Sequence, residues 1–268
     1  MQHTGPVSKM ITVLANPIQY HLPVGKVRVY MNDLIGQQLS LSWTGIIYCM
    51  NCGLQTKKSF GQGYCYPCFI SIPETEDCVL NPEKCRAHEG KARDMDYATE
   101  HCLQDHFVYL ALTNQVKVGV TRQSQVPTRW IDQGAWKAIK LAQTPNRYQA
   151  GIIEVELKNH LADKTNWRDM LTNKTDNTIS LVEEKKKIRI LVPQESVEYI
   201  TDDDTIVELV YPYQEIQTKI SSLNLDKDPT VNGKLVGIKG QYLIFEGGKV
   251  INIRKYGGYE LNFNMEPD

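Results

Sequence analysis

Four cysteines have the spacing of a zinc site. Two Cys-x2-Cys pairs, separated by twelve residues, use four of the seven cysteines of the chain: Cys49, Cys52, Cys65 and Cys68. Four thiolates complete a tetrahedral shell around zinc and leave no position for water or substrate, so such a site is structural. Metal binding of this kind contributes about 10 to 16 kcal/mol to folding. We therefore expect a structural Zn²⁺ on which the fold of residues 49–70 depends; ordinary buried or reactive thiols are the alternative.

A second group of metal-binding residue types follows among charged and turn-forming residues. Its members are Cys78, Cys85, His88, His101, Cys102 and His106. Cys78, Cys85 and Cys102 with one histidine, for which we take His88, could bind a second Zn²⁺. Their irregular spacing is equally compatible with solvated histidines and thiols without a metal.

The composition is that of a globular protein with two or three domains, at 268 residues, 41% hydrophobic and 23% charged. No apolar run approaches the roughly 18 residues of a membrane span. The amino terminus lacks the basic-then-apolar order of a signal peptide. We therefore expect a cytoplasmic protein without a membrane partner. The odd cysteine count and the paired spacing favour reduced, metal-bound thiols over disulfides.

Charge is distributed unevenly along the chain. Residues 107–173 contain nine basic and five acidic residues, a net charge of +4, whereas residues 195–268 contain seven basic and thirteen acidic residues, a net charge of −6. A basic middle segment is compatible with a polyanion site in one domain, with DNA or RNA as the expected partner. Solvated faces produce the same imbalance and are the alternative.

The expected fold class is α+β, in four segments. Residues 1–48 form a small β unit, and residues 49–106 form a cysteine-rich, zinc-binding segment with little regular structure. Residues 107–173 form a mixed domain. Residues 174–268 form a carboxy-terminal β domain, a small barrel or sandwich that the amino-terminal strands could complete. In this carboxy-terminal segment the polar residues 175–189 predict a solvated linker or a strand edge. A basic binding patch is the less favoured alternative.

The mixed domain, residues 107–173, has the clearest sequence pattern of strands and helices. FVYLAL and VKVGVT predict two strands of a hairpin, TRWID a helix, and AWKAIKLAQ a third strand. Thr144 and Pro145 predict the cap and first residue of a second helix, which runs to about Leu161.

Glu154 lies in that second predicted helix, at the edge of an apolar stripe. The stripe consists of Ala150, Ile153, Leu157 and Leu161. A carboxylate held against a stripe that faces a sheet is costly unless it pairs with a charge or binds a cation. Glu154 is therefore a candidate metal ligand, with a salt bridge to Arg129 or Arg147 as the alternative.

The order of these residues resembles the GIY-YIG nuclease domain. The match consists of Tyr109 in the first strand, Gly119 in the second, Arg129 opening a helix and Glu154 in a later helix. The resemblance implies a three-stranded sheet with flanking helices, an arginine that contacts the scissile phosphate, and a glutamate that binds Mg²⁺ or Mn²⁺. It also places Asn166, in DKTNW, at an asparagine that supports the site.

The chain departs from both tyrosine motifs of that family. Lys117-Val118-Gly119 stands where the second motif has Tyr-Ile-Gly, and Phe107 replaces the glycine of the first motif. An ammonium beside a phenol favours the phenolate, so we expect Lys117 to lower the pKa of Tyr109 and help it act as a general base. The alternative is a surface Lys117 and a Tyr109 that packs in the sheet.

Residues 7–265 as a whole resemble an uncharacterised bacterial family of zinc-binding proteins related to the GIY-YIG nucleases. The matching segments include the zinc array, VKVGVTRQSQVPTRWIDQGA, DKTNWRDML and GIKGQYLIF. The resemblance implies a further cysteine near Ala92. Two functions follow as expectations: metal-dependent hydrolysis of phosphodiester bonds in nucleic acid, or a catalytically inactive zinc-containing module that binds nucleic acid or protein.

Overall fold

The computed structural model describes residues 2–161, 166–176 and 178–265. The chain forms two compact units. Unit 1 comprises Met1–Ile70 and Leu209–Asp268, and unit 2 comprises Ser71–Glu208. The boundary at residue 70 falls inside the expected segment 49–106, and that at residue 208 inside the expected segment 174–268. The expected α+β class is confirmed, with several sheets and several helices.

Unit 1 is built from two β-sheets. Its strands are β1 (Gln2–Pro6), β2 (Ile11–Val13), β3 (Gln19–Val24), β4 (Val27–Tyr30), β5 (Gln38–Ile47), β10 (Ser221–Ser222), β11 (Thr230–Lys239), β12 (Tyr242–Phe245), β13 (Lys249–Asn252) and β14 (Tyr259–Met265). One sheet has the order β1-β14-β5-β11-β12-β13-β10, and the other has the order β2-β3-β4. Helix α1 (Tyr66–Ser71) ends the first part of the unit.

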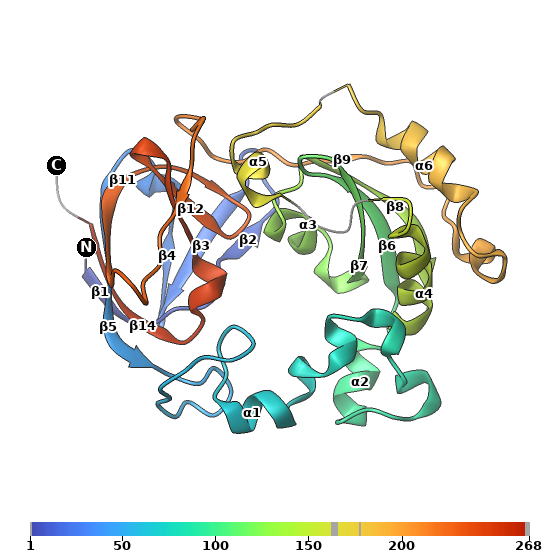
Figure 1. The fold of residues 1–268 in the computed structure, drawn as a ribbon, viewed down its shortest axis with the longest axis horizontal. Coiled ribbons are helices and arrows are strands. Elements are labelled where there is room, and N and C mark those ends of the chain that lie inside the picture. The colour runs from blue at the N-terminus through green and yellow to red at the C-terminus, as the bar shows by residue number, and fades with distance from the viewer. Residues whose placement is uncertain (1, 162–165, 177, 266–268) are drawn as a thin grey trace. The chain divides into compact units, whose positions relative to one another are not determined.

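The larger sheet joins the two ends of the chain. Strand β5 pairs antiparallel with β14 on one side and with β11 on the other, and β1 pairs with β14. In Figure 1 the blue amino-terminal strands and the orange and red carboxy-terminal strands lie side by side. The expectation that amino-terminal strands complete the carboxy-terminal β domain is confirmed.

Alternation of buried and exposed side chains explains these strands. Tyr20, Leu22 and Val24 are buried in β3, and every second residue between them is partly exposed. Leu261 and Phe263 follow the same two-residue period in β14. One face of each strand therefore packs in the core while the other reaches solvent.

Unit 2 contains a four-stranded antiparallel sheet with helices. Its elements are α2 (Met95–His101), β6 (His106–Leu112), β7 (Val116–Arg122), α3 (Thr128–Asp132), β8 (Lys137–Thr144), α4 (Arg147–Leu157), α5 (Trp167–Leu171), α6 (Leu181–Arg189) and β9 (Val207–Glu208). The strand order is β7-β6-β8-β9. The predicted hairpin, first helix and third strand are confirmed, and the short β9 adds a fourth strand beside β8.

Every residue of β6 is buried, so both faces of the sheet are covered. Val108 and Leu110 face the core cluster that includes Ala150, Ile153 and Leu157 of α4. Tyr109 points to the opposite face, where it meets Trp130 of α3. Figure 1 shows α4 and α3 on opposite sides of this sheet. The sheet thus separates an apolar layer from a face that carries polar groups.

The predicted start of the second helix is wrong. Thr144 is the last residue of β8, where it pairs with His106. The N-cap is Asn146, whose side-chain oxygen accepts a hydrogen bond from the Gln149 amide at 3.0 Å. Because strand pairing holds Thr144, the helix begins at Arg147; it ends at Leu157 instead of about residue 161.

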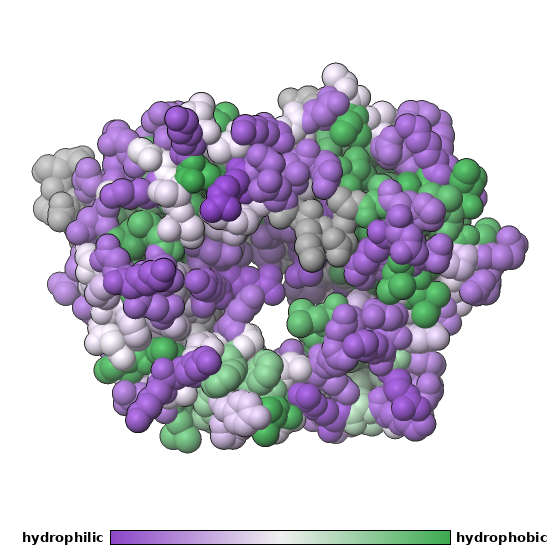
Figure 2. Space-filling model, viewed as in Figure 1, coloured by the Kyte–Doolittle hydropathy of each residue, from purple (hydrophilic) through white to green (hydrophobic). Residues whose placement is uncertain are grey.

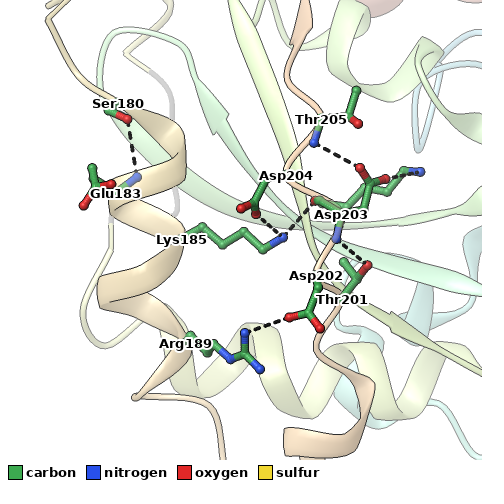
Figure 3. A network of polar contacts seen from close by, with 10 residues as sticks. Ser180, Glu183, Lys185, Arg189, Thr201, Asp202, Asp203, Asp204 and Thr205 are labelled. Atoms are coloured by element: carbon green, nitrogen blue, oxygen red, sulfur yellow. Dashed lines mark hydrogen bonds and ion pairs between the residues drawn. The ribbon is translucent and has the colours of Figure 1, made fainter.

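Residues 181–189 form a helix, so the prediction of a linker or strand edge is wrong there. Ser180 caps α6, with Glu183 three residues later. Lys185 is buried, and its Nζ donates to the Asp203 carbonyl at 2.8 Å and lies 2.9 Å from Asp204 Oδ1 (Figure 3).

The other basic side chains of α6 also have acidic partners, which argues against a basic binding patch. The pairs are Lys186–Glu183, Lys187–Glu184 and Arg189–Asp202.

Hydrophilic residues cover most of the face drawn in Figure 2, and hydrophobic residues form separate patches. Among the described residues, every helix is too short or too polar to cross a membrane.

A close backbone contact predicts the effect of one substitution. Gly151 is buried in α4, and a Cβ there would clash with the backbone of Pro82 and Glu83. Gly151→Ala should therefore lower the free energy of unfolding by about 1 to 3 kcal/mol, despite the higher helix propensity of alanine. Val155→Ala, at an exposed position of the same helix, should change it by less than about 0.5 kcal/mol. Urea unfolding measures both, and equal stability of the two variants would contradict the packing described.

Candidate functional site

The four cysteines of the paired motif come together in unit 1. The sulfurs of Cys49, Cys52, Cys65 and Cys68 all lie within 4.8 Å of one another, and those of Cys52 and Cys65 are 3.9 Å apart. Sulfurs at about 2.3 Å from a tetrahedral zinc would be about 3.8 Å apart. This four-cysteine cluster could therefore hold a metal ion such as zinc.

Backbone amides around the four-cysteine cluster stabilise thiolate. Burial raises the pKa of Cys49, but hydrogen bonds from the backbones of Cys52, Cys65 and Asn51 outweigh it and lower the pKa to about 6. The Asn51 side chain donates to Cys68 Sγ at 3.3 Å. Gly53 has a φ of 71°, which suits the tight turn after Cys52. The turn thus directs backbone N–H groups toward the cysteine sulfurs, and these hydrogen bonds stabilise thiolates that bind a metal.

Three further cysteines form a second cluster, in unit 2. Cys78, Cys85 and Cys102 are buried, and their sulfurs lie within 4.8 Å of one another. Arg147 Nη1 lies 3.6 Å from Cys78 Sγ. Hydrogen bonds from Cys102 and Cys78 lower the pKa of Cys85. This three-cysteine cluster could also hold a metal ion.

The structure does not bring the expected histidine into the three-cysteine cluster. The group of close ligand atoms found among the described residues contains the three sulfurs and excludes His88. Instead the His88 ring stacks on Tyr148, with centroids 4.4 Å apart. His101 stacks on Tyr97 and places Nδ1 3.0 Å from the Tyr97 carbonyl oxygen. Ala92, where the resemblance implies a cysteine, packs against the cluster.

Tyr109 lies across a glycine in the neighbouring strand of unit 2. Tyr109 and Gly119 are partners in the pairing of β6 with β7, and the phenol occupies the space that a Cβ of Gly119 would need. The Tyr109 oxygen accepts a hydrogen bond from Gln133 Nε2 at 3.0 Å. The Trp130 ring meets the phenol edge-on at 5.9 Å. Glycine at position 119 thus lets the phenol cross β7, an edge strand of the sheet.

Tyr109, Arg129 and Glu154 interact electrostatically. Burial raises the pKa of Tyr109, the Arg129 charge lowers it, and the Glu154 charge raises it further. The three residues come from β6, α3 and α4, which are separated along the chain. Tyr109 and Arg129 thus belong to the α3 side of the sheet, whereas Glu154 comes from α4 on the opposite side, where it pairs with Lys158.

The expected effect of Lys117 on Tyr109 is wrong in its net direction. Tyr109 is only 1% exposed, and this burial raises its pKa, so the phenol is protonated at neutral pH. Lys117 pairs with Ala111 and lies two residues before Gly119, on the same face of the sheet as Tyr109. Lys117 therefore lies on the expected side of the sheet, but the burial of Tyr109 decides the direction in which its pKa shifts.

Glu154 is largely buried and paired with a lysine of its own helix. Its carboxylate lies 3.2 Å from Lys158 Nζ. Burial raises the pKa of Glu154, while Lys158 and Arg129 lower it and Glu83 raises it. The closest cation is thus Lys158, not the expected Arg129 or Arg147.

Asn166 caps helix α5. Its side-chain oxygen accepts hydrogen bonds from the amides of Arg168 and Asp169, and its nitrogen donates to the Asp169 carboxylate at 2.6 Å. Residues 163–165 of the DKTNW motif lie outside the described residues. The expected supporting role of Asn166 stays a prediction.

Sequence reasoning missed Gln133 and Lys158. Each lies four residues after a residue that was identified, Gln133 after Arg129 and Lys158 after Glu154. Side chains four apart share a helix face, so this spacing was the available signal. Arg147 was considered only as a partner for Glu154, whereas it contacts Cys78.

Comparison with protein families gives one match, a model that covers residues 36–261. The chain belongs to the family described as protein of unknown function (DUF2797). The expectation of an uncharacterised family is thereby confirmed, and the family description assigns no activity. No curated protein and no solved structure matches the chain.

The four-cysteine cluster predicts the metal content of the protein. Protein purified without added metal should contain at least one tightly bound ion per chain, expected to be Zn²⁺, because the four sulfurs already converge. Cys52→Ser should lose one equivalent and melt at a lower temperature, whereas Met50→Leu, its exposed neighbour, should keep both properties. Elemental analysis and thermal unfolding measure these effects. A Cys52→Ser protein with unchanged metal content and melting temperature would contradict this assignment.

Proposed function

We propose that unit 2 binds the sugar–phosphate backbone of DNA or RNA and hydrolyses phosphodiester bonds with the help of a divalent metal ion. The supporting observation is the packing of the Tyr109 phenol across Gly119, where the charges of Arg129 and Glu154 both act on its pKa. Sequence order alone, through the resemblance to GIY-YIG nucleases, selected these residues from three separate elements. A polar group of this kind, set against an otherwise apolar sheet, is costly to bury without a functional reason.

Arg129 is the proposed phosphate clamp. It lies on α3, where its side chain is exposed and therefore accessible to a polyanion. A guanidinium can donate two parallel hydrogen bonds to phosphate and offsets the charge that grows during hydrolysis. The net charge of +4 over residues 107–173 supports the approach of such a substrate.

Tyr109 is a positioning residue in this mechanism. Its buried, protonated phenol cannot serve as a general base, but it accepts a hydrogen bond from Gln133 and lies within reach of the Arg129 charge. A fixed guanidinium loses less conformational freedom when it binds phosphate.

Glu154 is the residue that would hold Mg²⁺ or Mn²⁺. Such an ion, when bound, stabilises negative charge on the leaving oxygen. The Lys158 ammonium neutralises this buried carboxylate at 3.2 Å. Lys158 is about one-third exposed and can turn toward solvent when another cation takes its place.

The cysteine clusters have a structural role in this proposal. The four-cysteine cluster holds Zn²⁺, and the three-cysteine cluster holds a second thiophilic ion. Three thiolates and a divalent ion carry a net charge of −1, which Arg147 at 3.6 Å from Cys78 offsets.

A second function is favoured by one specific observation. Glu154 is paired with Lys158, and Tyr109 is protonated and buried. A module of this family that binds nucleic acid without cutting it would have this closed arrangement. The cleavage experiment separates the two functions.

Removal of the Glu154 charge should abolish cutting and spare binding. Glu154→Gln should slow cleavage of labelled DNA or RNA in Mg²⁺ or Mn²⁺ by about 10²- to 10³-fold, since it removes the stabilisation of the leaving oxygen. Glu156→Gln, on the exposed side of the same helix, is the matched control. Binding without any cleavage by the wild-type protein would favour the non-cutting module. Cleavage that survives Glu154→Gln would exclude the proposed role of Glu154.

The salt dependence of binding tests the phosphate clamp. Arg129→Ala should reduce the slope of log affinity against log salt concentration by about one unit, because one phosphate contact is lost. Lys187→Ala, at a basic residue already paired with Glu184, should leave the slope unchanged. Fluorescence anisotropy with a labelled oligonucleotide measures both. Equal slopes for wild type and Arg129→Ala would remove Arg129 from the interface.

A further inference from the structure

Unit 1 contains a cavity of about 420 Å³ beside the four-cysteine cluster. Its lining combines two aromatic residues with three lysines: Trp43, Tyr259, Lys57, Lys58 and Lys255. Cavities of this size commonly bind small molecules, with apolar walls and a few polar groups. None of the residues proposed for catalysis in unit 2 lines it.

One wall is the loop between the two cysteine pairs, which supplies Lys57, Lys58 and Gln62. The cysteines fix both ends of this loop. Near the second cysteine pair the loop contacts the short helix between β13 and β14, where Arg254 Nε donates to Gln62 Oε1 at 2.8 Å. The loop also packs directly on the backbone at Gly257, because a Cβ there would clash with the Gln62 carbonyl. The cavity therefore depends on the cysteine cluster that holds the loop.

The opposite wall is aromatic and held in place. Trp43 in β5 and Tyr259 in β14 have ring centroids 5.0 Å apart, with planes tilted by 44°. Trp43 Nε1 donates to the Ile46 carbonyl at 3.0 Å, and the Tyr259 hydroxyl donates to Asp226 at 2.8 Å. Trp43 is partly exposed to the cavity. A planar ring could stack on it with little loss of side-chain freedom.

The cavity carries net positive charge. Three ammonium groups face one carboxylate, Asp226, which already accepts the Tyr259 hydroxyl. Within the part of the chain that the structure describes, Lys57, Lys58 and Lys255 form no ion pair with a carboxylate, although Lys58 lies over the Phe60 ring and Lys255 over the Tyr256 ring. Unpaired ammonium groups at the rim of an aromatic cavity suit an anion attached to a flat ring.

We propose that this cavity binds a nucleotide, with its base stacked on Trp43 and its phosphate held by Lys57, Lys58 and Lys255. The nucleotide is either free or part of a single strand. A base paired within a duplex is stacked on its neighbours and cannot enter without unstacking. This site is separate from the proposed phosphodiesterase site and does not rest on it.

Titration of the full-length protein with AMP, with a labelled single-stranded oligonucleotide and with the matching duplex tests the proposal. Trp43→Ala should weaken binding by about 5- to 150-fold, as loss of one stacked base does. Trp43→Phe should restore most of it, and the Lys57→Ala, Lys58→Ala and Lys255→Ala variants should each weaken it. Lys26→Ala, at an exposed lysine of the same unit outside the cavity, should have no effect.

Lysine acetylation of the wild-type protein tests the proposal even if a variant does not fold. Mass spectrometry should show that the bound ligand protects Lys57, Lys58 and Lys255 from acetylation and leaves Lys26 unprotected. Binding of AMP would identify a free nucleotide, and binding of the oligonucleotide alone would identify a single strand. Equal affinity of the Arg129→Ala protein, which lacks the proposed phosphate clamp of unit 2, for duplex and single strand, uniform protection of all lysines, or no binding of any ligand would overturn the proposal. Arg129→Ala and Glu154→Gln should leave AMP binding and lysine protection unchanged, so failure of this site is distinguishable from failure of the site in unit 2.

Discussion

The convergence of four sulfurs is the constraint on which the cysteine-rich part of unit 1 depends. Residues 49–70 have little apolar core, since Leu54 is 69% exposed, Tyr66 55% and Ile70 52%. Hydrophobic burial cannot hold such a segment, so metal–thiolate bonds are the available source of order. The position of the lysine loop, and with it the aromatic cavity, follows from that anchoring.

Unit 2 depends on a different balance, between an apolar sheet and the polar groups placed on it. A phenol and a carboxylate are nearly removed from water at Tyr109 and Glu154. A hydrogen bond from Gln133 satisfies the first, and Lys158 neutralises the second. Burial of charge is tolerated only with such partners.

The sequence was most informative where one local rule decided the structure. Cysteine spacing predicted the first cluster, and alternating apolar residues predicted the β6–β7 hairpin and β8. It was least informative where tertiary contacts decide. Lys185 occupies a buried position of α6 beside Asp203 and Asp204, so the apolar stripe of that helix was hidden by a charged residue. His88 could not be excluded from the three-cysteine cluster by composition, because its stacking on Tyr148 joins residues sixty apart in the chain.

Strand β5 has a consequence for synthesis of the protein on the ribosome. Both of its neighbours, β11 and β14, are made only after residue 229, whereas unit 2 is one continuous stretch of chain. When unit 2 has left the ribosome it can complete its own core, while β5 still presents two unpaired edges. Strand β5 therefore keeps both edges unpaired until residues 230–265 have been made.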